Sequence, residues 1–356
     1  MPFGSSAVNS VRWWDAFSSR FDEIGKKIRG NGIRVSMHPG QYTVLNSPKE
    51  EVVARAISDL AYHARILNCL GVGPENKIVL HIGGAYGDKA QAAGRFIRNF
   101  SRLPAPVQNR LVVENDERIF DIADVLSIAD TLRIPTVFDN LHHTINPPGR
   151  TESDACWIQA CRATWGVRDG RQKIHYAQQD PLKRPGAHAQ SIRIREFLHF
   201  YDSLGAKKPD IMLEVKDKNL SAIKCINCVS AERNPLDLRS EWGRYRDTVL
   251  EKSPEDYAAM ERLLSAEGRY PAVAFYELLE HALGKEATAE SFIAAAKRVW
   301  GFFSEQATQA EKKAFLAGLS GYGSGCRTGD SVKSFLRKLA VKYDQSELMR
   351  STYFLF

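Results

Sequence analysis

Metal-binding side chains follow six short apolar stretches of the chain. Each stretch ends in a histidine or a carboxylate, at His38, His81, Glu114, Asp139, His175 and Glu214. Further histidines lie in loops close by, at His142, His143 and His188. Imidazoles and carboxylates crowded together are costly to bury, and a divalent cation makes such a cluster tolerable. This mixture of ligands suits Mn²⁺, Zn²⁺ or Fe²⁺ better than Ca²⁺ or Mg²⁺, so the sequence predicts a divalent metal centre.

The spacing of two pairs refines this prediction. Asp139 and His142 are three residues apart across a turn and can reach one ion, whereas His143 should point elsewhere. Lys173 and His175 are two residues apart in an extended stretch, so both side chains face the same side of a sheet. A charged ammonium group would repel metal ions. Lys173 is therefore expected to be neutral, to contact a phosphate, or to be modified into an anion.

Short β-branched runs alternate with amphipathic runs over the first 230 residues. Strands are predicted at 34–38, 76–84, 110–116, 134–143, 171–180 and 209–215. Helices are predicted between Ser47 and Gly71 and at 88–100, 121–132, 151–165 and 189–204. This alternation predicts a parallel sheet, and in a barrel the active site lies at the carboxyl ends of the strands. An open doubly wound sheet and a closed barrel both fit, but no GxGxxG follows the first strand, which disfavours a dinucleotide-binding fold.

The pattern changes near residue 230. From there to the C-terminus the sequence shows helical periodicity and no strand-like runs. We therefore predict two domains: a metal-binding β/α domain over residues 1–230 and an all-helical domain of unknown role over residues 231–356.

The composition is that of a globular protein, with 44% apolar and 26% charged residues among 356. No run of about 18 apolar residues and no signal-peptide pattern occurs, so we expect a cytoplasmic protein. The six cysteines are expected to be free thiols, and the single Cys225-Ile-Asn-Cys228 motif to be incidental. The net charge of +7 includes a segment, 162–195, in which eight Lys or Arg stand against Asp169 and Asp180. Such a segment is either a solvated face or a surface for an anionic partner such as nucleic acid.

Five motifs in order resemble the UV damage endonuclease family. They are SMHPGQYTVLNSP, VLHIGGAYGDK, LVVENDE, IPTVFDNLHH and KIHYAQQ, and the resemblance runs from about residue 2 to residue 230. It implies a TIM-type parallel β/α barrel related to endonuclease IV. The implied activity is a metal-dependent, ATP-independent nick in double-stranded DNA immediately 5′ to a UV photoproduct, leaving a 3′-hydroxyl. A cluster of up to three ions, commonly Mn²⁺, is implied, and no nucleotide cofactor. In a bacterial cell the substrate would be the DNA of the nucleoid.

The resemblance also implies roles for individual residues. The implied metal ligands are His38, His81, Glu114, Asp139, His142, His175, His188 and Glu214. The implied catalytic residues are Lys173, Glu114 and Glu214, and Lys173 matches a lysine that family members can carry in carboxylated form. Gln41 and Tyr42 match the pair that probes the DNA helix at the lesion.

The chain departs from the family pattern at its N-terminus. The family barrel has eight strands, whereas six are evident here, and MPFGSS matches the loop after the second strand. Ser6 stands where many members carry a histidine. We expect the true start to lie upstream, or the chain to be a fragment. Two alternatives to the endonuclease remain: a same-fold metal enzyme such as an abasic-site nuclease or a sugar isomerase, and a truncated, catalytically impaired DNA-binding protein.

Overall fold

The computed structural model describes residues 4–6, 8–230, 235–266 and 270–355. The chain divides into two compact units. We call Met1–Ile192 with Phe200–Lys218 the sheet unit, and Arg193–His199 with Asn219–Phe356 the helical unit. The predicted domain boundary near residue 230 stays a prediction; the structure assigns α10 (Asn219–Val229) to the helical unit.

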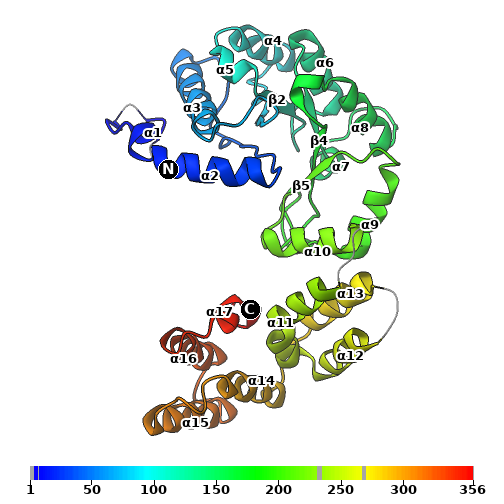
Figure 1. Cartoon of the computed structure of the whole chain (residues 1–356). Helices are drawn as coiled ribbons and strands as arrows, with labels where there is room; N and C mark the ends of the chain where they lie inside the picture. Colours follow the sequence, from blue (N-terminus) through cyan, green and yellow to red (C-terminus); the bar gives the residue numbers. More distant parts are fainter. Residues whose placement is uncertain (1–3, 7, 231–234, 267–269, 356) are drawn as a thin grey trace. The chain divides into compact units, whose positions relative to one another are not determined.

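The sheet unit is built on five parallel strands (Figure 1). They are β1 (Ile78–His81), β2 (Leu111–Glu114), β3 (Thr136–Asp139), β4 (Lys173–Tyr176) and β5 (Asp210–Leu213). The strands lie side by side in sequence order, each parallel to the next. A doubly wound sheet reverses its strand order at a switch point, whereas a β/α barrel adds strands in sequence order. The barrel-type α/β fold is therefore confirmed.

The first predicted strand, residues 34–38, forms only a single bridge. The backbone of Met37 donates to Lys77 O and accepts from Val79 N, which pairs it with β1 at one position. The neighbouring Val35 N–H donates instead to the Asn76 side chain, at 2.7 Å. Five of the six predicted strands therefore form. The segment 34–38 contributes only one bridge, because the Val35 N–H donates to a side chain and not to a neighbouring strand.

Helices follow the strands as predicted. The long ones in this part of the chain are α2 (Ser18–Gly30), α3 (Glu50–Cys69), α4 (Lys89–Phe100), α6 (Ile122–Leu132), α8 (Asp154–Ala163) and α9 (Ile194–Ser203). The short ones are α1 (Trp13–Ala16), α5 (Ala105–Gln108) and α7 (Asn140–Ile145). Helix α3 starts at Glu50 without a side-chain cap, because Ser47 Oγ accepts from Lys49 N rather than from the first turn. The helix predicted to begin near Ser47 therefore begins at Glu50.

Alternation along the strands produces two kinds of core. Side chains on one face, such as Ile78, Leu80 and Val113, pack against Leu60 of α3 and Phe96 of α4. On the opposite face, a second cluster of Val79, Val112 and Val137 packs with Trp165. Two residues further along each strand, on the same face, lie His81, Glu114 and Asp139. A valine layer thus lies directly before a layer of metal-capable side chains.

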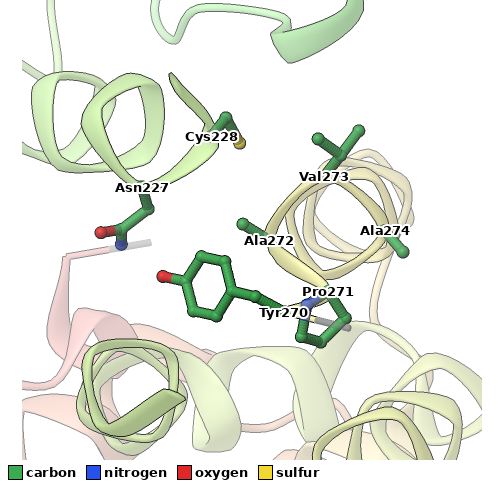
Figure 2. Close-up of a pocket in the computed structure, with 7 residues that line it drawn as sticks. All are labelled: Asn227, Cys228, Tyr270, Pro271, Ala272, Val273 and Ala274. Atoms are coloured by element: carbon green, nitrogen blue, oxygen red, sulfur yellow. The ribbon is translucent and has the colours of Figure 1, made fainter. Parts of the chain in front are cut away.

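The helical unit contains, in its described residues, only helices as regular elements. They are α10, α11 (Pro235–Lys252), α12 (Pro254–Ser265), α13 (Ala272–Leu283), α14 (Ala289–Gly301), α15 (Gln309–Gly323), α16 (Gly329–Lys342), α17 (Ser346–Arg350) and a 3₁₀ turn (Thr352–Phe354). Their core gathers apolar side chains of α14, α15 and α16 around Tyr353. A small cavity of about 240 Å³ lies between α10 and the start of α13. Figure 2 shows the residues that line it, among them Asn227 and Tyr270. All six cysteines are free. None of the described helices is long and apolar enough to cross a membrane.

Candidate metal centre

Glu114, the last residue of β2, lies among histidines and is completely buried. Its Oε2 lies 3.0 Å from His38 Nε2 and 3.6 Å from His81 Nε2. Its Oε1 lies 2.7 Å from His175 Nδ1. Strand register produces this convergence, because it aligns His81 with Glu114 and Asp139 with His175 at the carboxyl end of the sheet.

Three groups of side chains have the geometry to hold a metal ion, and all three share Glu114. In each group the ligand atoms lie within 4.8 Å of one another. The groups are His38–His81–Glu114, Glu114–Asp139–His142 and Glu114–His175–Glu214. The donors are imidazole nitrogens and carboxylate oxygens, which suit a divalent transition metal. The sheet unit therefore contains a cluster that can bind divalent cations, with three adjoining places for them.

The pair Asp139 and His142 is organised by a helix start. Asp139 is the N-cap of α7, and its Oδ1 accepts a hydrogen bond from His142 N at 2.7 Å. This leaves Asp139 Oδ2 free to face the cluster. The adjacent His143 points away, because its ring packs near Phe138 and lies 3.7 Å from Asp154.

His188 reaches the cluster from a loop. Its Nε2 lies 3.5 Å from Glu214 Oε2, so it extends the third group. Gln179 holds this loop, because it forms an antiparallel bridge with His188 and its side chain accepts from Gly186 N and donates to Arg184 O. The structure thus brings together all eight of the residues that the sequence suggested as ligands.

Charge and burial act against each other in this cluster. Burial favours the neutral form of Glu114, but the charges of His175 and His81 outweigh it and hold the pKa of Glu114 well below its usual range. Burial likewise opposes the charged form of His175, but the carboxylate of Glu114 raises the pKa of His175 to about 10. For His38, burial opposes and the hydrogen bond to Glu114 favours the charged form, and the pKa is raised. Glu114 therefore remains an anion at neutral pH.

Several polar atoms of the cluster are buried without a hydrogen-bond partner among the described residues. They are His81 Nδ1, Asp139 Oδ2 and His175 Nε2. Orphaned polar atoms are rare in protein interiors, and each calls for an explanation such as an ion. Imidazole nitrogens and a carboxylate oxygen left over at one place are the atoms that a divalent cation coordinates. The residues therefore fit a bound metal.

Lys173 lies one layer away from the cluster, level with the valines. Its side chain is 3% exposed, and its Nζ has no hydrogen-bond partner within the described part of the chain. Burial, together with the charge of Arg34, lowers the pKa of Lys173 to about 8, against the opposing charge of Asp210. As expected from the spacing of two, Lys173 shares a strand face with His175.

Two asparagines that sequence reasoning missed lock the strand ends together. Asn115 accepts from Asp139 N at 2.9 Å and donates to Asp139 O at 3.1 Å. Asn140 makes the same reciprocal pair with Ala177, at 2.8 Å and 3.0 Å. Each side chain imitates one rung of a β-ladder just beyond the last strand residue, so it fixes the position of the neighbouring strand end. The one signal in the sequence was that each asparagine directly follows a candidate ligand.

Gln41 and Tyr42 lie in the loop after His38, and both are exposed; Tyr42 is 74% exposed. The base of the loop is firmly held, because Thr43 Oγ1 donates to Asp59 Oδ2 at 2.7 Å and Leu45 is fully buried. An exposed tyrosine on an anchored loop is available for contact with a ligand.

Comparison with known proteins gives matches over the same part of the chain. The family model described as UV-endonuclease UvdE matches residues 1–234. The UV DNA damage endonuclease of Clostridium perfringens (strain 13 / Type A) is 44% identical over 250 residues, which cover 70% of this chain and 60% of that protein. The UV DNA damage endonuclease of Bacillus cereus (strain ATCC 10987 / NRS 248) is 34% identical, over 61% of this chain and 68% of the relative.

A solved structure also matches. The crystal structure of SacUVDE aligns with a TM-score of 0.60 and 42% identity, over 64% of this chain and 75% of the other. The helical C-terminal part matches a different family model, described as Protein of unknown function (DUF1722), over residues 248–356. The UvdE family model covers well over half of the chain, and the matched residues include the whole metal-capable cluster. The chain therefore belongs to the UV-endonuclease UvdE family.

Proposed function

We propose that the sheet unit is a metal-dependent endonuclease that cuts UV-damaged double-stranded DNA. The observation that carries this proposal is the convergence of three metal-capable groups on Glu114, in a chain of the UV-endonuclease family. The exposed Gln41–Tyr42 loop suits a large substrate such as a DNA duplex better than a small sugar, which disfavours the alternative of a sugar-processing enzyme.

The eight clustered side chains would hold up to three divalent ions, which we propose to be Mn²⁺. When bound, such ions supply Lewis acidity and an activated water for phosphodiester hydrolysis. Glu114, which all three groups share, and Glu214, beside His175 and His188, would supply carboxylate ligands. Because Glu114 remains an anion, it would balance part of the positive charge of the ions.

Lys173 would act in a carboxylated form. Its amine is buried and has no hydrogen-bond partner among the described residues, and it lies on the strand face that carries His175. The ammonium group first loses one proton. The neutral amine then forms a C–N bond to CO₂ and releases a second proton, so a buried cation becomes a carbamate anion. The carbamate would extend the side chain from the valine layer toward the ions, so a former source of repulsion becomes a ligand.

Gln41 and Tyr42 would select the lesion, and the nick would fall immediately 5′ to the photoproduct and leave a 3′-hydroxyl. An aromatic side chain on an anchored loop can fill the space that opens when damaged bases unstack. Base–aromatic stacking is worth about 1–3 kcal/mol, so Gln41→Ala/Tyr42→Ala should weaken binding of lesion DNA by about 5- to 150-fold. Undamaged DNA, held through phosphate contacts, should bind almost as before. Paired titrations at one salt concentration measure this difference, and an equal loss on both duplexes would refute the lesion-probe role.

Cleavage of a duplex with a single photoproduct tests the activity. We expect nicking with Mn²⁺ and none with a chelator, and we expect His175→Ala to abolish both nicking and metal content. His199→Ala is a matched control, because His199 is an exposed histidine outside the cluster. Product mapping on a sequencing gel reports the position of the nick and the chemistry of its end. Retained nicking in the His175 variant with unchanged metal would refute the assignment.

A further inference from the structure

A pocket of the sheet unit lies at the amino ends of the strands, opposite to the metal cluster. Its volume is about 370 Å³, which is within the usual range of small-molecule sites. Its walls come from the end of α8 and from the loops that lead into β4 and β5. The lining side chains that matter here are Arg162, Trp165, Arg171, Lys207, Lys208 and Pro209. This is the amino end of the sheet, so the pocket shares no side chain with the cluster around Glu114.

Four of these lining side chains are cations, and none of the pocket's lining residues is an acid. Arg162 donates to Lys207 O at 2.6 Å and to Gln172 Oε1 at 2.9 Å, and Arg171 donates to Lys208 O at 2.9 Å. These acceptors are neutral, so they fix the guanidinium groups in place without neutralising their positive charge. An array of this kind is ready to bind an anion.

One carboxylate close to the pocket is already engaged. Asp210, the first residue of β5, lies 2.7 Å from Arg34 Nη2 and 3.5 Å from Arg171 Nε. One negative charge is thus divided between two guanidinium groups. The exposed Lys207 lines the pocket and has no ion pair among those described for this unit. The pocket therefore retains an excess of positive charge.

An aromatic wall stands beside the cations. Trp165 is fixed from behind, because its Nε1 donates to Thr136 O at 2.9 Å and its ring packs against the valine layer. The ring remains partly exposed and lines the pocket together with Pro209. A fixed, partly open indole next to guanidinium and ammonium groups offers stacking for a base and charge-assisted hydrogen bonds for a phosphate.

We propose that this pocket binds a nucleotide, with its phosphate against Arg171 and Lys207 and its base against Trp165. The proposal goes beyond the endonuclease activity and does not depend on it. The same chemistry is offered by a free mononucleotide and by a nucleotide within a single strand of nucleic acid. The experiment must therefore include both sources.

Isothermal titration of the full chain with AMP, inorganic phosphate and a ten-residue oligothymidylate tests the proposal. EDTA is present throughout, so the metal cluster does not bind the probes through ions. We expect saturable binding of AMP or of the oligonucleotide, at least tenfold tighter than that of phosphate, because only the nucleotides can stack on Trp165. The tighter of the two nucleotide probes identifies the source.

Two variants localise the binding. Arg171→Ala/Lys207→Ala should weaken nucleotide binding at least tenfold. Lys207→Ala alone should weaken it at least threefold, and this change removes an exposed side chain and leaves the loop intact. Lys312→Ala/Lys313→Ala is the charge-matched control, because both lysines are exposed on α15, and it should bind within twofold of the wild type. Equal binding by wild type and both pocket variants would overturn the proposal, as would the absence of saturable nucleotide binding.

Discussion

Two buried carboxylates of the sheet unit and two of the helical unit have partners of different kinds. In the sheet unit, Glu114 and Asp139 are completely buried, and the groups that face them are histidines. In the helical unit, Asp247 and Glu251 are also buried, but each faces a permanent cation. Arg298 Nε lies 2.9 Å from Asp247 Oδ1, and Lys333 Nζ lies 2.9 Å from Glu251 Oε2.

This difference separates a site from a structural core. A carboxylate paired with Arg or Lys is already neutralised, since these side chains stay protonated and cannot coordinate a metal. A carboxylate among histidines can exchange protons for a metal ion, because a neutral imidazole is itself a ligand. Buried charge alone therefore does not mark a functional site; the identity of the partner does.

The largest expected effect among the tests of this contrast is that of Glu114→Gln. The amide keeps the size of the side chain but removes the charge that all three metal-capable groups share. We expect metal affinity and nicking of lesion DNA to fall by more than about 100-fold, beyond the 10- to 100-fold typical of changes outside the ligand shell. Elemental analysis and a nicking assay measure the two quantities, and circular dichroism checks that the fold persists. Glu241→Gln, which changes a buried acid of the helical unit, should leave both unchanged.

The next largest effect is expected for Asn115→Ala. This change removes both hydrogen bonds that fix the end of β3 but takes away no ligand. Metal affinity should therefore fall by about 10- to 100-fold, as for other groups that orient ligands. Calorimetric titration with Mn²⁺ measures it. Saturating metal should restore nicking if Asn115 only positions Asp139, whereas a loss that excess metal cannot restore would assign Asn115 a direct role in the reaction.

Asp247→Ala tests the helical unit and should spare the metal site. Breaking a buried ion pair costs about 3–5 kcal/mol, and we expect about 1–3 kcal/mol here because a third of the Arg298 side chain is exposed and solvent screens it. Hydrogen–deuterium exchange in the full chain should show faster exchange in α11 and α14, with metal content unchanged. Glu305→Ala, at an exposed position, is the control. A loss of metal in the Asp247 variant would contradict the separation of roles.

The smallest effect concerns pH. Burial raises the pKa values of Glu241, Asp247 and Glu251 above those of the unfolded chain. An acid with a raised folded pKa gives stability that is present below the unfolded pKa and lost as pH rises through the folded pKa. Glu241, Asp247 and Glu251 should therefore contribute stability that is lost as pH rises above about 4.5. Asp256 and Glu311 of the same unit act in the opposite direction, because hydrogen bonds lower their pKa values.

The free energy of unfolding can be measured by urea unfolding at pH 5 and at pH 7. After unfolding, a labelling pulse at a single pH and mass spectrometry of α11 peptides report how much of the helical unit is unfolded. The double change Asp247→Asn/Glu251→Gln should flatten the pH dependence. A double variant that gains no stability relative to the wild type between pH 5 and pH 7 would contradict the sign derived from the buried acids.

The sequence by itself determined much of the sheet unit. Strand and helix periods are local, so a run such as Ile78–His81 could be assigned without knowing its neighbours. The rule that parallel strands present their carboxyl ends together then placed His81, Glu114 and His175 at one edge. The residue motifs added the family and the exposed loop at Gln41 and Tyr42.

The tertiary structure decided which atoms meet. Only the tertiary structure shows that Glu114 meets His38, 76 residues earlier, and that Lys173 lies level with the valines rather than among the ligands. The sequence also did not predict the hydrogen bonds by which Asn115 and Asn140 join strand ends. Nor did it predict that residues 34–38 form one bridge, or that Asp247 pairs with Arg298. The physical reason is that periodicity fixes the face on which a side chain lies, whereas hydrogen bonds and ion pairs depend on distances between segments far apart in the chain.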